Sequence, residues 1–121
     1  MNFADRLKTL PAVDHLVALE LVSRFGQVLA TIENRPGQVG SLAVYHALAQ
    51  QHNGCITPAA AALGLEWYAE HTAVAQNQPG SHPNIDRLLS WAAGREIYQV
   101  RLVYQSTHNC GPIDTQRDIC R

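Results

Sequence analysis

The sequence is poor in charge and contains no long apolar run. Of its 121 residues, 16% are charged and the formal net charge is -1, whereas soluble domains usually carry about 25% charged residues. A chain this close to neutral lacks the basic excess that neutralises phosphates, so we expect no nucleic-acid partner. A transmembrane helix needs roughly 18 or more consecutive apolar residues, and no stretch reaches that length, so we expect no membrane partner.

Cysteine is also scarce. The three cysteines are Cys55, Cys110 and Cys120, an odd number in a chain long enough to fold without cross-links, so a disulfide framework is not indicated. The first eight residues mix acids and bases before any apolar run, which is unlike a signal peptide. We therefore expect a cytoplasmic protein.

Apolar side chains are plentiful enough for one core. Hydrophobic residues make up 46% of the chain, which suits a single domain of this length. We predict that the domain spans residues 1–104. Residues 105–121 are rich in small polar side chains and are predicted to form a flexible tail.

Apolar spacing predicts the elements in order. Residues 2–9 form a short helix that ends before Pro11. Residues 15–23 and 27–33 alternate apolar and polar side chains around a turn at Gly26, which predicts an antiparallel hairpin. Residues 96–104 alternate in the same way and form a last strand.

Three helices are predicted between the hairpin and the last strand. The first begins at Ser41 as N-cap and ends at Gly54 in the C′ position. The second begins after Thr57 with proline at its first position and continues to about residue 76. The third carries an apolar stripe from Ile85 and ends at Gly94. The fold class is thus α+β, with a three-stranded sheet, made of the N-terminal hairpin and the C-terminal strand, packed by three to four helices. The last strand could pair with either hairpin strand.

Two loops share the pattern Asn-x-Pro-Gly, at residues 34–37 and 77–80, and each precedes a helix. If both lie at one end of the sheet, they form the walls of a small pocket in which free helix N–H groups attract an anion. Its residues would be Arg35, Gly37, Gly40, Ser41, Ser81 and His82. The alternative is that each loop is an ordinary turn and Ser41 only caps a helix.

Histidines and a carboxylate on the helices suggest a second hypothesis. His46, Glu70, His71 and His82 could serve a small enzyme or a metal-binding protein. Glu-x-x-x-Glu-His is not a usual ligand spacing, and we favour the alternative that Glu70 and His71 form an exposed acidic face next to a boundary histidine. We therefore assign no metal and no cofactor.

Cysteine and histidine also occur close together, as His52 with Cys55 and His108 with Cys110, followed by Cys120. These spacings are not those of ordered zinc knuckles, so they indicate zinc only weakly.

Arg87 and Trp91 lie one turn apart, off the apolar stripe of the third helix. A tryptophan there is either a boundary residue or part of a contact surface, with a second copy of the chain among the partners to consider.

Four stretches resemble a small bacterial family of about one hundred residues: residues 30–37 (ATIENRPG), 44–49 (VYHALA), 70–71 (EH) and 82–89 (HPNIDRLL). The resemblance covers residues 1–104 and implies a soluble single-domain bacterial protein without an assigned activity. Because no complete catalytic or ligand motif is present, the leading hypothesis is a binding or interaction module that uses the two Asn-x-Pro-Gly loops. Its partner would be a small ligand or a protein.

Overall fold

A computed structural model describes residues 1–105 of the protein. The predicted tail lies, from residue 106 onward, outside the described residues. Gln105 itself is hydrogen-bonded, since its N–H donates to the carbonyl oxygen of His15 at 3.0 Å.

The sheet has four antiparallel strands, not the three predicted. They are β1 (Leu16–Val22), β2 (Val28–Glu33), β3 (Cys55–Ile56) and β4 (Tyr98–Tyr104), in the order β2-β1-β4-β3. The missed strand β3 is two residues long and pairs with Tyr98 and Gln99 of β4. A two-residue strand is too short to show an alternation of period two, so only its pairing with β4 identifies it.

The hairpin forms where the alternating pattern predicts it. Ser23 closes the turn, because its N–H donates to the Gln27 carbonyl at 2.8 Å and its carbonyl accepts from Gly26 at 2.9 Å. Gly26 has a φ of +87°, which glycine adopts at little cost. β4 lies beside β1, which settles the pairing that the sequence left open.

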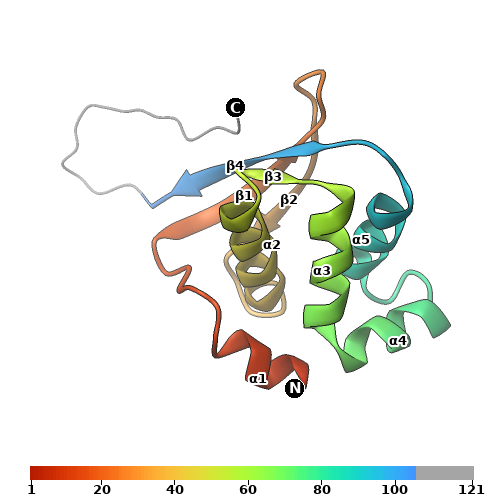
Figure 1. Ribbon diagram of the computed structural model, residues 1–121. Helices are drawn as coiled ribbons and strands as arrows, with labels where there is room; N and C mark the ends of the chain where they lie inside the picture. The colour runs from red at the N-terminus through yellow and green to blue at the C-terminus, as the bar shows by residue number, and fades with distance from the viewer. Residues whose placement is uncertain (106–121) are drawn as a thin grey trace.

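Within residues 1–105, five helices cover one side of the sheet (Figure 1). They are α1 (Phe3–Leu7), α2 (Val39–Gln51), α3 (Pro58–Tyr68), α4 (Glu70–Asn77) and α5 (Pro83–Ala93). The core lies between these helices and the sheet, where Leu19, Leu48 and Leu88 are fully buried. None of these helices is long and apolar enough to cross a bilayer.

Helix boundaries follow the local signals at Thr57 but not at Ser41. The Thr57 hydroxyl accepts from the Ala60 N–H at 3.0 Å, so this residue is the N-cap of α3 as predicted. α2 begins two residues before Ser41, and its N-cap is Gln38. At the other end, His52 is the C-cap, and the chain then leaves the helix through Asn53 and Gly54, which both have positive φ.

The single helix predicted from Pro58 to about residue 76 is divided at Ala69. This residue has φ 53° and ψ -119°, a conformation that strains any residue with a Cβ atom. The break keeps its polar groups bonded, because the Thr72 hydroxyl donates to the Leu65 carbonyl at 2.6 Å. The chain therefore turns between α3 and α4.

Candidate functional site

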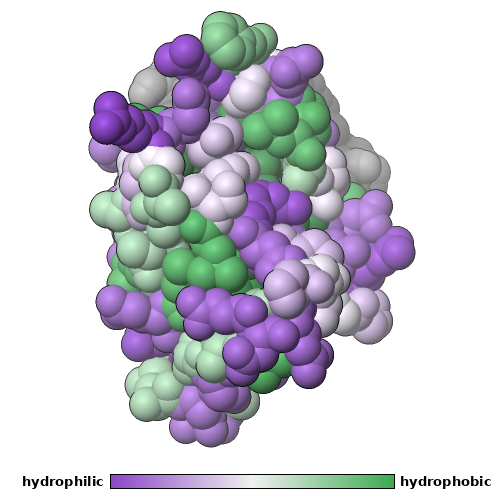
Figure 2. All heavy atoms as spheres, turned by 90° about the vertical axis from the view of Figure 1, so that its right-hand side faces the viewer, coloured by the Kyte–Doolittle hydropathy of each residue, from purple (hydrophilic) through white to green (hydrophobic). Residues whose placement is uncertain are grey.

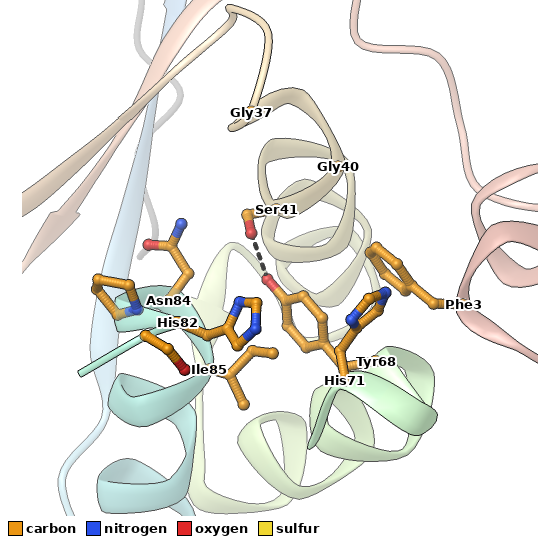
Figure 3. Close-up of a pocket in the computed structure, with 11 residues that line it drawn as sticks. Phe3, Gly37, Gly40, Ser41, Tyr68, His71, His82, Asn84 and Ile85 are labelled. Atoms are coloured by element: carbon orange, nitrogen blue, oxygen red, sulfur yellow. Dashed lines mark hydrogen bonds between the residues drawn. The ribbon is translucent and has the colours of Figure 1, made fainter. Parts of the chain in front are cut away.

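A cavity of about 340 Å³ opens where α1, the start of α2, the α3–α4 junction and the start of α5 meet (Figure 3). Acidic residues, lysine and arginine are absent from its lining, which lies entirely within the described part of the chain. The lining residues are Phe3, Gly37, Gly40, Ser41, Tyr68, His71, Ser81, His82, Pro83, Asn84 and Ile85.

Of the two Asn-x-Pro-Gly loops, the first lines the cavity with Gly37, and the second is followed by the lining residues Ser81 and His82. Gly37 and Gly80 have φ values of +89° and +94°, which a side chain would disfavour. Asp86 holds the second loop, since its Oδ2 accepts from the Gly80 N–H at 2.9 Å. Pro83, whose ring fixes φ at a helical value, then begins α5.

Phe3 and Tyr68 form an aromatic wall. Their rings stack with centroids 5.0 Å apart, and the rings of Phe3 and His71 form a T-shaped pair with centroids 5.2 Å apart. The Phe3 N–H donates to Oε1 of Glu70 at 3.0 Å, which attaches α1 to α4. Hydrogen bonds from the N–H groups of Glu70 itself and of Phe3 lower the pKa of this carboxyl, so it is negatively charged at neutral pH.

Two imidazoles face the same cavity. His71 from α4 and His82, the residue before α5, have ring centroids 5.9 Å apart. Nε2 of His71 lies 3.9 Å from Oε2 of Glu70, so the carboxylate is beside this ring without lining the cavity. Figure 3 shows Phe3 and His71 on one side of the pocket and Asn84 on the other.

Two hydroxyl groups are joined inside the pocket. The Tyr68 hydroxyl donates to Oγ of Ser41 at 2.6 Å, as the dashed line in Figure 3 marks. Burial raises the pKa of Tyr68 far above its usual value, because a phenolate would lose its hydration there. Tyr68 therefore stays protonated and acts as a donor to Ser41.

Behind the pocket, a second group of hydrogen bonds holds the start of α5. The Tyr45 hydroxyl donates to the Asn84 carbonyl at 2.6 Å. Nη1 of Arg87 donates to the Tyr45 hydroxyl at 3.2 Å and to Oδ1 of Asn84 at 2.8 Å. Burial raises the pKa of Tyr45 to about 12, against a smaller opposing effect of Arg87.

The structure brings together most residues that we assigned to the loop pocket. Gly37, Gly40, Ser41, Ser81 and His82 all line the cavity. Arg35 does not, since its guanidinium bonds to Oε1 of Glu33 at 2.7 Å. Sequence reasoning missed Phe3, Tyr68 and Asn84, which no local motif marks.

The four residues of the second hypothesis do not meet. His46 is buried beside His15, with ring centroids 5.7 Å apart, while Glu70, His71 and His82 lie at the pocket. Nδ1 of His46 has no hydrogen-bond partner, and burial, then His15, lower the pKa of His46. Within residues 1–105, no group of three or more His, Cys, Asp or Glu side chains is placed to hold a metal ion.

The remaining candidates are placed as follows. Cys55 is disulfide-bonded, which the odd cysteine count did not lead us to expect, and His108, Cys110 and Cys120 lie outside the described residues.

Trp91 stacks on Tyr98 with centroids 3.7 Å apart, and Arg87 bonds to Tyr45 and Asn84. Both side chains are thus engaged within the chain. Figure 2, which faces the side of α4 and α5, shows hydrophobic areas interrupted by hydrophilic side chains.

Fold and site together define a small α+β protein whose helices cover one sheet face and enclose a cavity at two helix N-termini. The chain belongs to the bacterial family described as "Uncharacterized protein conserved in bacteria (DUF2322)", which matches residues 3–102. This confirms the family resemblance seen in the sequence, and the matched region contains every residue that lines the cavity. No curated protein and no solved structure matches the chain.

Proposed function

We propose that this protein is a small-ligand-binding domain and that the cavity between α1, α2, α4 and α5 is its ligand site. The observation that carries the proposal is the composition of the cavity wall. Two aromatic rings, Phe3 and Tyr68, line it together with a few polar groups. Ligand sites in proteins commonly have this make-up, with apolar walls and few polar groups that orient the ligand.

The size of the cavity supports the same proposal. Its volume of about 340 Å³ falls at the lower end of the range of about 300–1,000 Å³ that small-molecule pockets occupy. The lining comes from segments far apart in the chain, so the cavity depends on the complete fold. A ligand with one ring and one polar group suits a space of this size.

The polar groups favour binding over catalysis. Ser41 bonds to Tyr68, which is a protonated donor and not a base that could activate the serine. The Glu70 carboxylate bonds to the Phe3 N–H outside the lining. We therefore prefer a binding domain to the small enzyme of our second hypothesis, and we prefer the pocket to the Arg87 and Trp91 surface as the site.

A fragment screen by ¹H–¹⁵N NMR tests the proposal. We expect small ring compounds to shift the amide signals of Ser41, His71 and Ile85, which come from three sides of the cavity. Signals that shift only at other places in the protein, or a complete absence of hits, would contradict the proposal.

A pair of matched variants tests the location. Ser81 is exposed and lines the cavity, so Ser81→Trp places a large side chain at the cavity mouth. Ser90→Trp makes the same exchange at an exposed position of α5 that does not line the cavity. We expect Ser81→Trp to weaken the hits at least tenfold and Ser90→Trp to leave them unchanged. Equal affinity in both variants would place the binding elsewhere.

The cytoplasmic location and the absence of a nucleic-acid partner stay predictions from composition. A homodimer likewise stays a prediction.

A further inference from the structure

Asn84 presents hydrogen-bond donors to the pocket. Its Oδ1 accepts from Nη1 of Arg87 at 2.8 Å, and a guanidinium can only donate. This bond determines which end of the carboxamide is the oxygen. Since Asn84 lines the cavity, its Nδ2 amide has two hydrogens to donate to a ligand.

The Ser41 hydroxyl also presents a hydrogen-bond donor to the pocket. Its Oγ already accepts from the Tyr68 hydroxyl at 2.6 Å, and burial keeps that phenol protonated. A hydroxyl that accepts one bond still has its own hydrogen. The hydroxyl hydrogen of Ser41 is therefore available for a hydrogen bond to a ligand.

The backbone at the start of α2 adds further donors. Gly40 and Ser41 are the second and third residues of this 13-residue helix, and the N–H groups of a first helical turn have no acceptor within the helix. Glycine at positions 37 and 40 leaves both of these lining residues without side chains. The positive end of the helix dipole favours negative charge at this place.

Two carboxylates next to lining residues each accept a hydrogen bond from the backbone. Oδ2 of Asp86 accepts from the Gly80 N–H at 2.9 Å, and Oε1 of Glu70 accepts from the Phe3 N–H at 3.0 Å. The Ser81 hydroxyl uses its hydrogen on the Gln78 carbonyl at 2.7 Å, so towards a ligand this side chain can only accept. Donors from Ser41 and Asn84 thus face a cavity that no carboxylate lines.

We infer that the site selects a small organic oxyanion: a carboxylate or a phosphate monoester on a compact ring. The ring would lie against Phe3 and Tyr68. The oxygens, which can only accept, would take hydrogens from Ser41 and Asn84 and from the imidazoles of His71 and His82. This inference rests on the proposed function and names its ligand class.

Calorimetric titration with four probes tests the ligand class. Benzoate and phenyl phosphate carry the anion. Benzamide is the neutral counterpart of benzoate with similar shape, and phenol is phenyl phosphate without its phosphoryl group. We expect each anion to bind at least tenfold more tightly than its neutral counterpart, and the better of the two anions identifies carboxylate or phosphate as the preferred group. Inorganic phosphate, which lacks the ring, is expected to bind more weakly than phenyl phosphate.

The outcomes separate the two proposals. If benzamide binds in the pocket as tightly as benzoate, and phenol as tightly as phenyl phosphate, the oxyanion inference is wrong but the ligand site stands. The inference is also wrong if neutral hits of the NMR screen occupy the pocket and neither anion binds. If no ring compound binds at all, the proposed function itself is wrong.

The substitution Asn84→Asp tests the donor argument at one atom. Aspartate keeps an oxygen for Arg87 but presents a second oxygen to the ligand in place of the amide hydrogens. We expect benzoate affinity to fall at least tenfold while benzamide affinity changes less than twofold. Gln27→Glu makes the same charge change in the turn between β1 and β2 and is expected to have no effect. Figure 1 shows this turn on the far side of the molecule from α4.

Ser41→Ala provides a second test that does not depend on the folding of Asn84→Asp. It removes the hydroxyl hydrogen, so benzoate affinity is expected to fall about fivefold with benzamide affinity less affected. A uniform loss for both probes, in a variant with an unchanged NMR spectrum beyond the pocket, would overturn the donor argument.

Discussion

Ala69 is expected to lower the stability of the protein, so that its replacement by glycine raises it. The residue has φ 53° and ψ -119°, and such a conformation costs a residue with a Cβ atom about 1–3 kcal/mol. Glycine relieves this strain but has a more flexible unfolded state, which offsets roughly 0.5–1 kcal/mol. The expected net gain in the free energy of unfolding is about 1 kcal/mol, or roughly 4 °C in melting temperature for a domain of this size.

Ala73→Gly is the matched control. Ala73 is exposed inside α4, where glycine is less favourable than alanine by about 1 kcal/mol. The same exchange, four positions apart, is therefore expected to change the urea midpoint in opposite directions. Circular dichroism during urea unfolding measures both variants, and an Ala69→Gly protein that is no more stable than the parent would refute the strain argument.

Two pH effects follow from buried titratable groups. Burial and His15 lower the pKa of His46 below 6.5, so the imidazole binds a proton more tightly in the unfolded chain than in the folded one. The free energy of unfolding is therefore highest above pH 6.5 and falls as the pH drops below that value. His46→Phe is expected to flatten the change in urea midpoint between about pH 7.5 and 5.5, and an unchanged slope would contradict this reasoning. Because burial raises the pKa of Tyr45 from 10.0 to about 12, stability is full below pH 10 and is lost as the pH rises toward 12, by about 3 kcal/mol. Tyr45→Phe is expected to reduce that alkaline loss but to be about 1–3 kcal/mol less stable at pH 7, since the bonds to Asn84 and Arg87 are lost; equal alkaline curves for parent and variant would contradict it.

Elements with strong local signals were predictable from the sequence. The hairpin has two alternating runs around Gly26, and α3 has Thr57 and Pro58 at its start; both form as expected. In each case the deciding interactions join residues only a few positions apart, such as the Thr57 hydroxyl and the Ala60 N–H. Short-range steric and hydrogen-bond preferences are a property of the local sequence.

Other features depend on contacts between residues that are distant in the sequence. Ser41 has the residue type of an N-cap but lies inside α2, where its hydroxyl meets Tyr68. The break at Ala69 carries no proline or glycine signal, and packing sustains it against local preference. β3 exists because it pairs with β4.

For the candidate site, the shared Asn-x-Pro-Gly pattern indicated which loops to compare. Five of the residues assigned from it line one cavity, while Arg35 turns away to Glu33. The aromatic wall was not predictable, because Phe3 and Tyr68 belong to different helices and meet only through the packing of α1 on α3.

The sequence by itself determined the α+β class, the hairpin, most of the helices and the two glycine turns, since these follow from short-range backbone preferences and apolar spacing. Tertiary structure decided the strand order, the break at Ala69 and the enclosure of the cavity, because those depend on side chains that are distant in the chain. The orientation of the pocket donors belongs to this second group. Tyr68 and Arg87 set it through hydrogen bonds to Ser41 and Asn84.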